Sequence, residues 1–267
     1  MAVPVIDFSK LNGDDRARTL GQIANACQEW GFFQLVNHGI PVELLERVKK
    51  VSSEFYKLER EENFNKSKGM ELLDKSVESL ENSDWEDVVT LLDDNEWPSN
   101  TPGFQETMKE YRFELKRLAE KVMQVMDENL GLPKGYINKA FNDGDGDGEN
   151  AFFGTKVSHY PPSPHPEKPL PNAIVINTGD QIEVLSNGQY KSAWHRVLSS
   201  VDGNRRSIAS FYNPSLKATI APAPQLVEKT KQLGETYPKF VFGDYMSVYV
   251  QQKFLPKEPR FQAVRAM

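Results

Sequence analysis

One histidine and an arginine–serine pair have the types and spacing best suited to chemistry in this sequence. His195 lies in A-W-H-R-V, which has the composition of a β-strand. Arg205 and Ser207 lie two residues apart in R-R-S-I-A-S-F-Y, so both side chains point to one face of a strand. A guanidinium offers a fork of donors and a hydroxyl adds one more, which suits a carboxylate. The sequence therefore predicts a carboxylate-binding strand face.

Whether His195 shares that face depends on the turn D-G-N between the two segments. A three-residue loop pairs Val201 with Arg205, and His195 then lies on the same face as Arg205 and Ser207. If only Asp202 and Gly203 form the loop, the register shifts by one and the side chains point apart. The sequence permits both registers, and we favour the three-residue loop.

Helices dominate the first half of the chain and strands the second. Apolar residues at helical spacing predict helices after Asp14, from Pro41, and over residues 103 to 130, where Gly131 ends the third. Strand patterns follow in F-G-T-K-V-S-H-Y, A-I-V-I-N, Q-I-E-V-L, Y-K-S-A-W-H-R-V-L and R-R-S-I-A-S-F-Y, with S-N-G-Q as a hairpin turn. A last helix is expected over residues 242 to 254, followed by a polar tail. We predict an α+β chain on a barrel or jelly roll, with a helical module (1–150), a β core (151–241) and a C-terminal helix and tail (242–267).

Composition excludes several functional classes. The chain has 267 residues and a formal net charge of −6, with no stripe of Lys and Arg, so we expect no nucleic-acid partner. No apolar run reaches about 18 residues, so we expect no membrane span, and a cytoplasmic location. The single cysteine, Cys27, lies among helical apolar positions and is expected to be a buried, inert thiol.

Long ordered motifs resemble one known family. The segments V-P-V-I-D-F and A-C-Q-E-W-G-F-F-Q-L-V-N-H-G-I-P resemble the opening module of plant Fe(II)/2-oxoglutarate-type dioxygenases. Six later segments are similar to the 1-aminocyclopropane-1-carboxylate oxidases, the ethylene-forming enzymes: F-G-T-K-V-S-H-Y-P-P, I-N-T-G-D-Q-I-E-V-L-S-N-G, Y-K-S-A-W-H-R-V, R-R-S-I-A-S-F-Y-N-P, Y-P-K-F-V-F-G-D-Y and K-E-P-R-F. The resemblance covers nearly the whole chain.

The resemblance implies a double-stranded β-helix (jelly roll) that holds one Fe(II) through two histidines and a carboxylate. It also implies a small amino-acid substrate, O2, ascorbate and bicarbonate. His195 matches the distal metal histidine, and Arg205 and Ser207 match the Arg-x-Ser pair that binds a carboxylate or bicarbonate. The other matched positions are pocket residues Lys156 and Tyr160 and the C-terminal activity residues Lys253 and Arg260.

The metal-ligand segment is where the sequence departs from the family. The family has a His-x-Asp pair between its proline loop and the I-N-T-G-D-Q strand, and this chain has no His-x-Asp. Roughly forty residues, enough for about four strands with their turns, are absent where Glu167 to Pro169 join the two family segments. His165-Pro166-Glu167 is a poor substitute because prolines on both sides keep it out of a central strand.

Four hypotheses follow from this departure. The favoured one is an internally shortened oxidase that is inactive or strongly impaired and of doubtful Fe(II) retention. The second is an active oxidase in which other groups replace the absent pair. Within the enzyme class the runner-up is a sibling 2-oxoglutarate-dependent dioxygenase of plant hormone or flavonoid metabolism, and the matches at Lys156 and K-E-P-R-F speak against it. The last hypothesis is a non-catalytic shortened variant that acts as a binding protein, and no motif in the sequence supports it.

Overall fold

The structure is a computed structural model, and it describes the chain in seven stretches: residues 3–66, 87–142, 150–160, 172–195, 205–229, 237–252 and 257–265. The predicted D-G-N hairpin loop, His165, Glu167 and Lys253 lie outside these stretches. None of the described helices has the length and apolar content needed to cross a membrane.

Three helices form the scaffold of the first half, and their buried positions repeat every three or four residues. Ile23 and Cys27 lie on the buried face of α1, and Leu44 and Val48 on that of α2. The longest helix, α5, ends at Gly131, whose left-handed backbone (φ 69°) lets its N–H bond the carbonyls of Asp127 and Glu128. The elements are β1 (Val5–Asp7), η1 (Phe8–Asn12), α1 (Arg16–Glu29), β2 (Phe32–Val36), α2 (Val42–Phe55), the π-helical η2 (Tyr56–Arg60), α3 (Glu61–Asn65), β3 (Asp87–Leu91), α5 (Phe104–Leu130) and α6 (Tyr136–Phe141).

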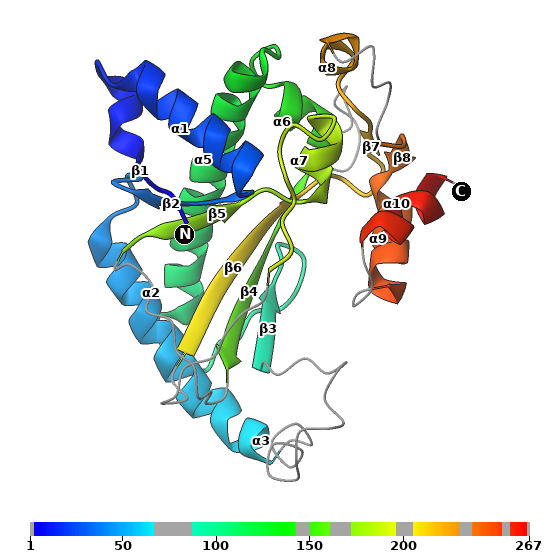
Figure 1. The fold of residues 1–267 in the computed structure, drawn as a ribbon. Helices are drawn as coiled ribbons and strands as arrows, with labels where there is room; N and C mark the ends of the chain where they lie inside the picture. The colour runs from blue at the N-terminus through cyan, green and yellow to red at the C-terminus, as the bar shows by residue number, and fades with distance from the viewer. Residues whose placement is uncertain are drawn as a thin grey trace.

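The second half contains the long strands and a helical C-terminus. Its elements are β4 (Phe152–Tyr160), β5 (Ile174–Asn177), α7 (Asp180–Leu185), β6 (Arg205–Asn213), β7 (Thr219–Ile220), α8 (Pro224–Lys229), β8 (Phe240–Val241), α9 (Phe242–Gln251) and α10 (Lys257–Arg265). The strands form sheets ordered β1-β2-β5, β3-β4-β6 and β7-β8 among the described residues. In Figure 1, α2 and α5 lie to the left of the β3-β4-β6 sheet, and α8, α9 and α10 lie to its right.

The strand prediction for Q-I-E-V-L is wrong, because this segment is the helix α7. Ile182, Val184 and Leu185 are all buried, and a short run buried on every side carries no periodicity that separates strand from helix. The turn S-N-G-Q is correspondingly not a hairpin. It ends α7, with Asn187 (φ 49°) and Gly188 (φ 79°) in the left-handed region that commonly ends a helix.

Two further expectations are corrected by the structure. Residues 191–195, predicted as part of a strand around His195, have no regular secondary structure. The expected polar tail contains α10, whose Phe261 and Val264 are buried against the rest of the chain. Burial of these two side chains supplies the free energy that orders the segment.

Candidate functional site

The pairing of β4 with β6 places four of the predicted site residues on one face of a sheet. The two strands run antiparallel, with Tyr160 opposite Arg205, Ser158 opposite Ser207 and Lys156 opposite Ala209. Directly paired residues share a face, and so do residues two apart along one strand. Lys156, Tyr160, Arg205 and Ser207 therefore project from the same side, which we call the strand face.

Three of these residues are in contact. The hydroxyls of Tyr160 and Ser207 lie 3.0 Å apart, and the guanidinium of Arg205 lies 4.8 Å from the centroid of the Tyr160 ring. The Nη1 atom of Arg205 is buried and has no hydrogen-bond partner among the described residues. A buried donor without an acceptor is costly, by about 1–3 kcal/mol, and an incoming carboxylate would satisfy it.

The opposite side of the same sheet is covered by helices. His159 stacks on Tyr56 with ring centroids 3.8 Å apart, and Arg206 lies over Tyr56 and bonds the hydroxyl of Ser53 at 3.2 Å. Burial lowers the pKa of His159, and the neighbouring guanidinium of Arg206 lowers it further. Burial therefore favours the neutral form of His159, whose ring points away from the strand face.

His195 lies beside the β1-β2-β5 sheet and is exposed. Its ring packs edge-on against Phe32 at 5.0 Å, and its Nδ1 atom lies 3.1 Å from the carbonyl oxygen of Ala193. The carboxylate of Glu183 accepts the N–H of Ser192 at 2.5 Å, which fixes the chain three residues before His195. The structure thus positions His195 through contacts with β2 and α7. None of its described contacts is with Arg205, Tyr160 or Ser207.

The residues that the structure describes do not fit an iron site of the family type. Such a site needs two histidines and a carboxylate that converge on one side of the ion. In the described stretches, no three His, Cys, Asp or Glu side chains gather closely enough to hold a metal ion. His195, the one candidate ligand within them, makes its ring contacts with Phe32 and a backbone carbonyl.

Arg260 lies in the C-terminal part of the molecule, where it contacts α7. Its Nη1 atom is 3.4 Å from the carboxylate of Asp180, and its guanidinium stacks 4.8 Å from the ring centroid of Tyr249. Asp180 also accepts the hydroxyl hydrogen bond of Tyr245. Burial raises the pKa of Tyr245, and the Asp180 carboxylate raises it further, so this hydroxyl remains a donor. Arg260 therefore anchors α10 to the first residue of α7.

The two acidic residues of α7 were missed by our sequence reasoning. Asp180 and Glu183 lie three apart in the first turn of the helix, where negative charge is favourable. Glu183 accepts from both Ser192 and the hydroxyl of Tyr237, the latter at 2.8 Å. The pattern D-x-x-E after a glycine was a usable signal, but it was hidden by the strand interpretation of the same residues.

Two family models match the chain. The "non-haem dioxygenase in morphine synthesis N-terminal" model matches residues 3–111, and the "2OG-Fe(II) oxygenase superfamily" model matches residues 163–214. A solved structure described as JOX2 in complex with 2OG, Fe and JA has a TM-score of 0.76 and 28% identity, covering 98% of this chain and 88% of that one. A putative 2OG-Fe(II) oxygenase from Caulobacter crescentus shares the fold, with a TM-score of 0.75. These likenesses confirm the predicted jelly-roll fold class.

Comparison with curated relatives identifies the family to which the chain belongs within this superfamily. 1-Aminocyclopropane-1-carboxylate oxidase 5 of Arabidopsis thaliana is 61% identical over 312 residues, and a protein of the same name from Musa acuminata is 60% identical over 310 residues. Both alignments cover the whole of this chain and the whole of the relative. The alignment of 312 positions exceeds the 267 residues of the chain, so at least 45 positions have no residue here. The chain belongs to the family of 1-aminocyclopropane-1-carboxylate oxidases, within the 2OG-Fe(II) oxygenase superfamily.

Proposed function

We propose that this chain is an internally shortened 1-aminocyclopropane-1-carboxylate oxidase that keeps the carboxylate-binding part of its site and lacks most of the metal-binding part. The observation that carries the proposal is the combination of 61% identity over full length with at least 45 unmatched positions. The size of that gap agrees with the roughly forty residues that the join at Glu167–Pro169 lacks, enough for about four strands.

The retained part would bind the carboxylate of the amino-acid substrate or bicarbonate. Arg205 supplies a charged donor whose Nη1 atom has no partner among the described residues, and Ser207 and Tyr160 supply hydroxyls 3.0 Å apart beside it. Lys156 lies on the same face, two residues along β4 from Ser158, which pairs with Ser207. Together these groups favour a small anion over a neutral ligand.

The absent part would have supplied two of the three protein ligands to iron. Fe(II), when bound in this family, supplies the site for O2 chemistry, and ascorbate is the expected reductant. A single imidazole such as His195 offers neither the charge compensation nor the facial geometry that this ion requires. We therefore expect Fe(II) retention and turnover to be lost or strongly reduced in this chain.

Anaerobic titration with Fe(II) tests the metal half of the proposal. The full chain, fused to a soluble carrier, is compared with its His195→Ala variant and with the carrier alone. The expected result is weak binding that hardly differs between the chain and the variant. Stoichiometric binding that His195→Ala abolishes would overturn the proposal, because it would mean that other residues complete the site.

A further inference from the structure

A cavity of about 460 Å³ lies between α5 and the loop that follows β3. Its lining includes Arg112, Lys109 and Lys116 from α5, Trp97 and Asp93 from the loop, and Phe153 from β4. Phe153 lies an odd number of residues from Lys156 and Tyr160, so it points to the helix-covered side of the sheet. The cavity is therefore separate from the strand face proposed to bind substrate.

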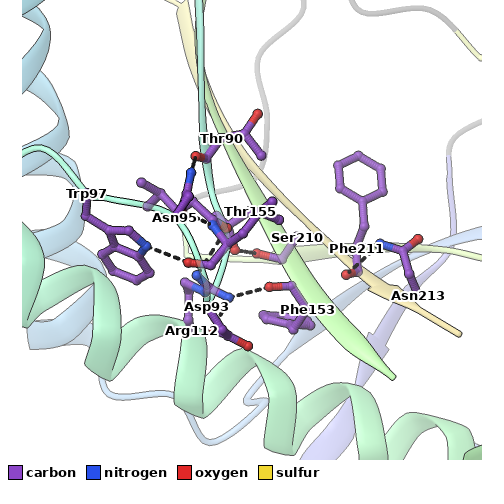
Figure 2. A network of polar contacts seen from close by, with 12 residues as sticks. Thr90, Asp93, Asn95, Trp97, Arg112, Phe153, Thr155, Ser210, Phe211 and Asn213 are labelled. Atoms are coloured by element: carbon purple, nitrogen blue, oxygen red, sulfur yellow. Dashed lines mark hydrogen bonds and ion pairs between the residues drawn. The ribbon is translucent and has the colours of Figure 1, made fainter. Parts of the chain in front are cut away.

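The loop wall of the cavity is preorganised by its own hydrogen bonds. The side chain of Asn95 accepts from the N–H of Leu92 and donates to the carbonyl of Thr90, both at 2.8 Å. The indole N–H of Trp97 donates to the carbonyl of Leu92 at 2.6 Å. Figure 2 shows Asn95 and Trp97 on this loop, on the same side of the sheet as Arg112. A wall held in this way loses little conformational entropy when a ligand binds.

Arg112 forms the charged floor of the cavity. Its side chain is only 5% exposed, and it donates to the backbone carbonyls of Leu91 (3.1 Å) and Phe153. Its guanidinium lies 4.9 Å from the ring centroid of Trp97. Within the described part of the chain its one ion-pair partner is Asp93, at 2.7 Å, and the Asp93 side chain is 76% exposed. The buried guanidinium of Arg112 is thus paired with a carboxylate that is itself largely exposed to solvent.

Two lysines add positive charge at the rim. Lys109 and Lys116 are exposed, and neither makes an ion pair with a residue that the structure describes. Positions three to four apart lie on one face of a helix, so Lys109, Arg112 and Lys116 form a single row along α5. The ammonium of Lys109 also lies 5.9 Å from the centroid of the Trp97 ring. Three cations face one anion in this cavity, on a protein whose net charge is −6.

We propose that this cavity binds a small organic polycarboxylate, one carboxylate of which replaces Asp93 on Arg112 while the others meet Lys109 and Lys116. Asp93 occupies the position of the ligand group, so the geometry for a carboxylate on Arg112 already exists. The spacing of the three cations along α5, about 1.5 Å of rise per residue, suits a ligand with two or three acidic groups. A single compact anion would reach fewer of them.

Calorimetric titration with citrate at constant ionic strength tests this inference. The protein is the full chain fused to a soluble carrier, and the carrier alone is the blank. Lys109→Gln and Lys116→Gln should each weaken citrate binding about two- to fivefold, as expected for partly exposed ion pairs. Asp93→Asn should strengthen it, because the competing carboxylate is then neutral.

Lys121→Gln is the matched control, since Lys121 is an exposed lysine of the same helix that does not line the cavity. Its citrate affinity should equal that of the unaltered chain. The inference is overturned if citrate gives no more heat than the blank, if Lys121→Gln weakens binding as much as the two rim variants, or if Asp93→Asn weakens it. Equal binding of inorganic phosphate would also overturn it, because the polycarboxylate would then have no advantage.

Discussion

The guanidinium of Arg205 is the most direct sign of a ligand on the strand face, because its buried Nη1 atom lacks a hydrogen-bond partner among the described residues. Its neighbours are already arranged: Tyr160 bonds Ser207 and offers its ring to the guanidinium. The two-residue spacing of Arg205 and Ser207 was sufficient to predict that they share a face. Their pairing with β4 could not be predicted, since nothing local in the sequence specifies pairing across about fifty residues.

The role of the Arg205 cluster can be tested in a restored chain. In the restored chain, the segment absent at Glu167–Pro169 is supplied from the Arabidopsis relative. Arg205→Gln should raise the KM for the amino-acid substrate or bicarbonate about 10- to 100-fold, because a hydrogen bond to a charged group contributes about 1.5–3 kcal/mol. Ser207→Ala should raise it about fivefold, from the loss of about 1 kcal/mol. Steady-state ethylene production gives both constants.

Ser210→Ala is the matched control for these variants. Ser210 lies on the same strand but on the helix-covered side, where its hydroxyl is 2.9 Å from that of Thr155 (Figure 2). Its substitution should leave both KM values unchanged. An Arg205→Gln variant with normal KM values for substrate and bicarbonate would remove the role proposed for the strand face.

The single thiol gives a second prediction at this scale. Burial raises the pKa of Cys27 from 9.0 to about 12, so a thiol reagent at pH 8 should label the chain in denaturant and leave the folded chain unlabelled. Above pH 9 the unfolded thiol ionises while the folded one stays protonated, so the free energy of unfolding should fall by about 1.4 kcal/mol per pH unit up to about pH 12 from this group. Rapid native labelling would contradict the buried placement.

At the scale of elements, α7 connects the C-terminal helices to the segment that carries His195. Asp180 binds Arg260 and Tyr245, while Glu183 binds Tyr237 and the N–H of Ser192. This connection was invisible in the sequence because a short run of buried apolar residues was interpreted as a strand. The long helix α5, by contrast, was predicted almost to the residue, since its apolar stripe repeats over 27 residues and a glycine ends it.

The hydrogen bond from Tyr237 to α7 predicts that Tyr237→Phe lowers the stability of the fold. The substitution removes the 2.8 Å hydrogen bond to Glu183, which is buried, so the free energy of unfolding should fall by about 1–2 kcal/mol. Urea denaturation measures the change. Tyr249→Phe is the comparison, and it should have a much smaller effect, because the ring that stacks on Arg260 is kept. Equal losses in the two variants would mean that the Glu183 hydrogen bond adds little.

The approach of the His195 segment to the end of α1 gives another prediction. Gly31 has φ +68°, and a Cβ there would lie 2.4 Å from the backbone oxygen of Lys191. Gly31→Ala should therefore destabilise the fold by at least about 2 kcal/mol, from left-handed strain and the clash together. Gly21→Ala is the control, because a Cβ at Gly21 meets nothing within 4 Å and alanine in a helix is favourable by about 0.5–1 kcal/mol. Urea midpoints that move in the same direction would contradict this account.

For the whole molecule, we infer from the absent segment that the β core is incompletely covered. The described strands form two sheets of three strands and one of two. Large apolar side chains stand exposed on or beside them, among them Trp194 at 63%, Val175 at 55% and Phe211 at 48%. Unpaired strand edges and exposed apolar faces promote self-association.

The chain released from a soluble carrier should accordingly aggregate, while the restored chain should remain in solution. Light scattering coupled to size-exclusion chromatography measures the outcome for both. The physical reason is that the restored segment would cover apolar surface that otherwise contacts water. A monomeric shortened chain that melts cooperatively would show that the remaining core is sufficient by itself.

The central claim is that the absent metal-ligand segment, and not the strand face or the C-terminal helices, limits activity. Ethylene production from 1-aminocyclopropane-1-carboxylate with Fe(II), ascorbate and bicarbonate tests it most directly, with the chain and the restored chain assayed side by side. We predict no ethylene above the protein-free blank from the chain, and turnover from the restored chain that His195→Ala abolishes. Turnover by the unrestored chain that His195→Ala abolishes would contradict the account.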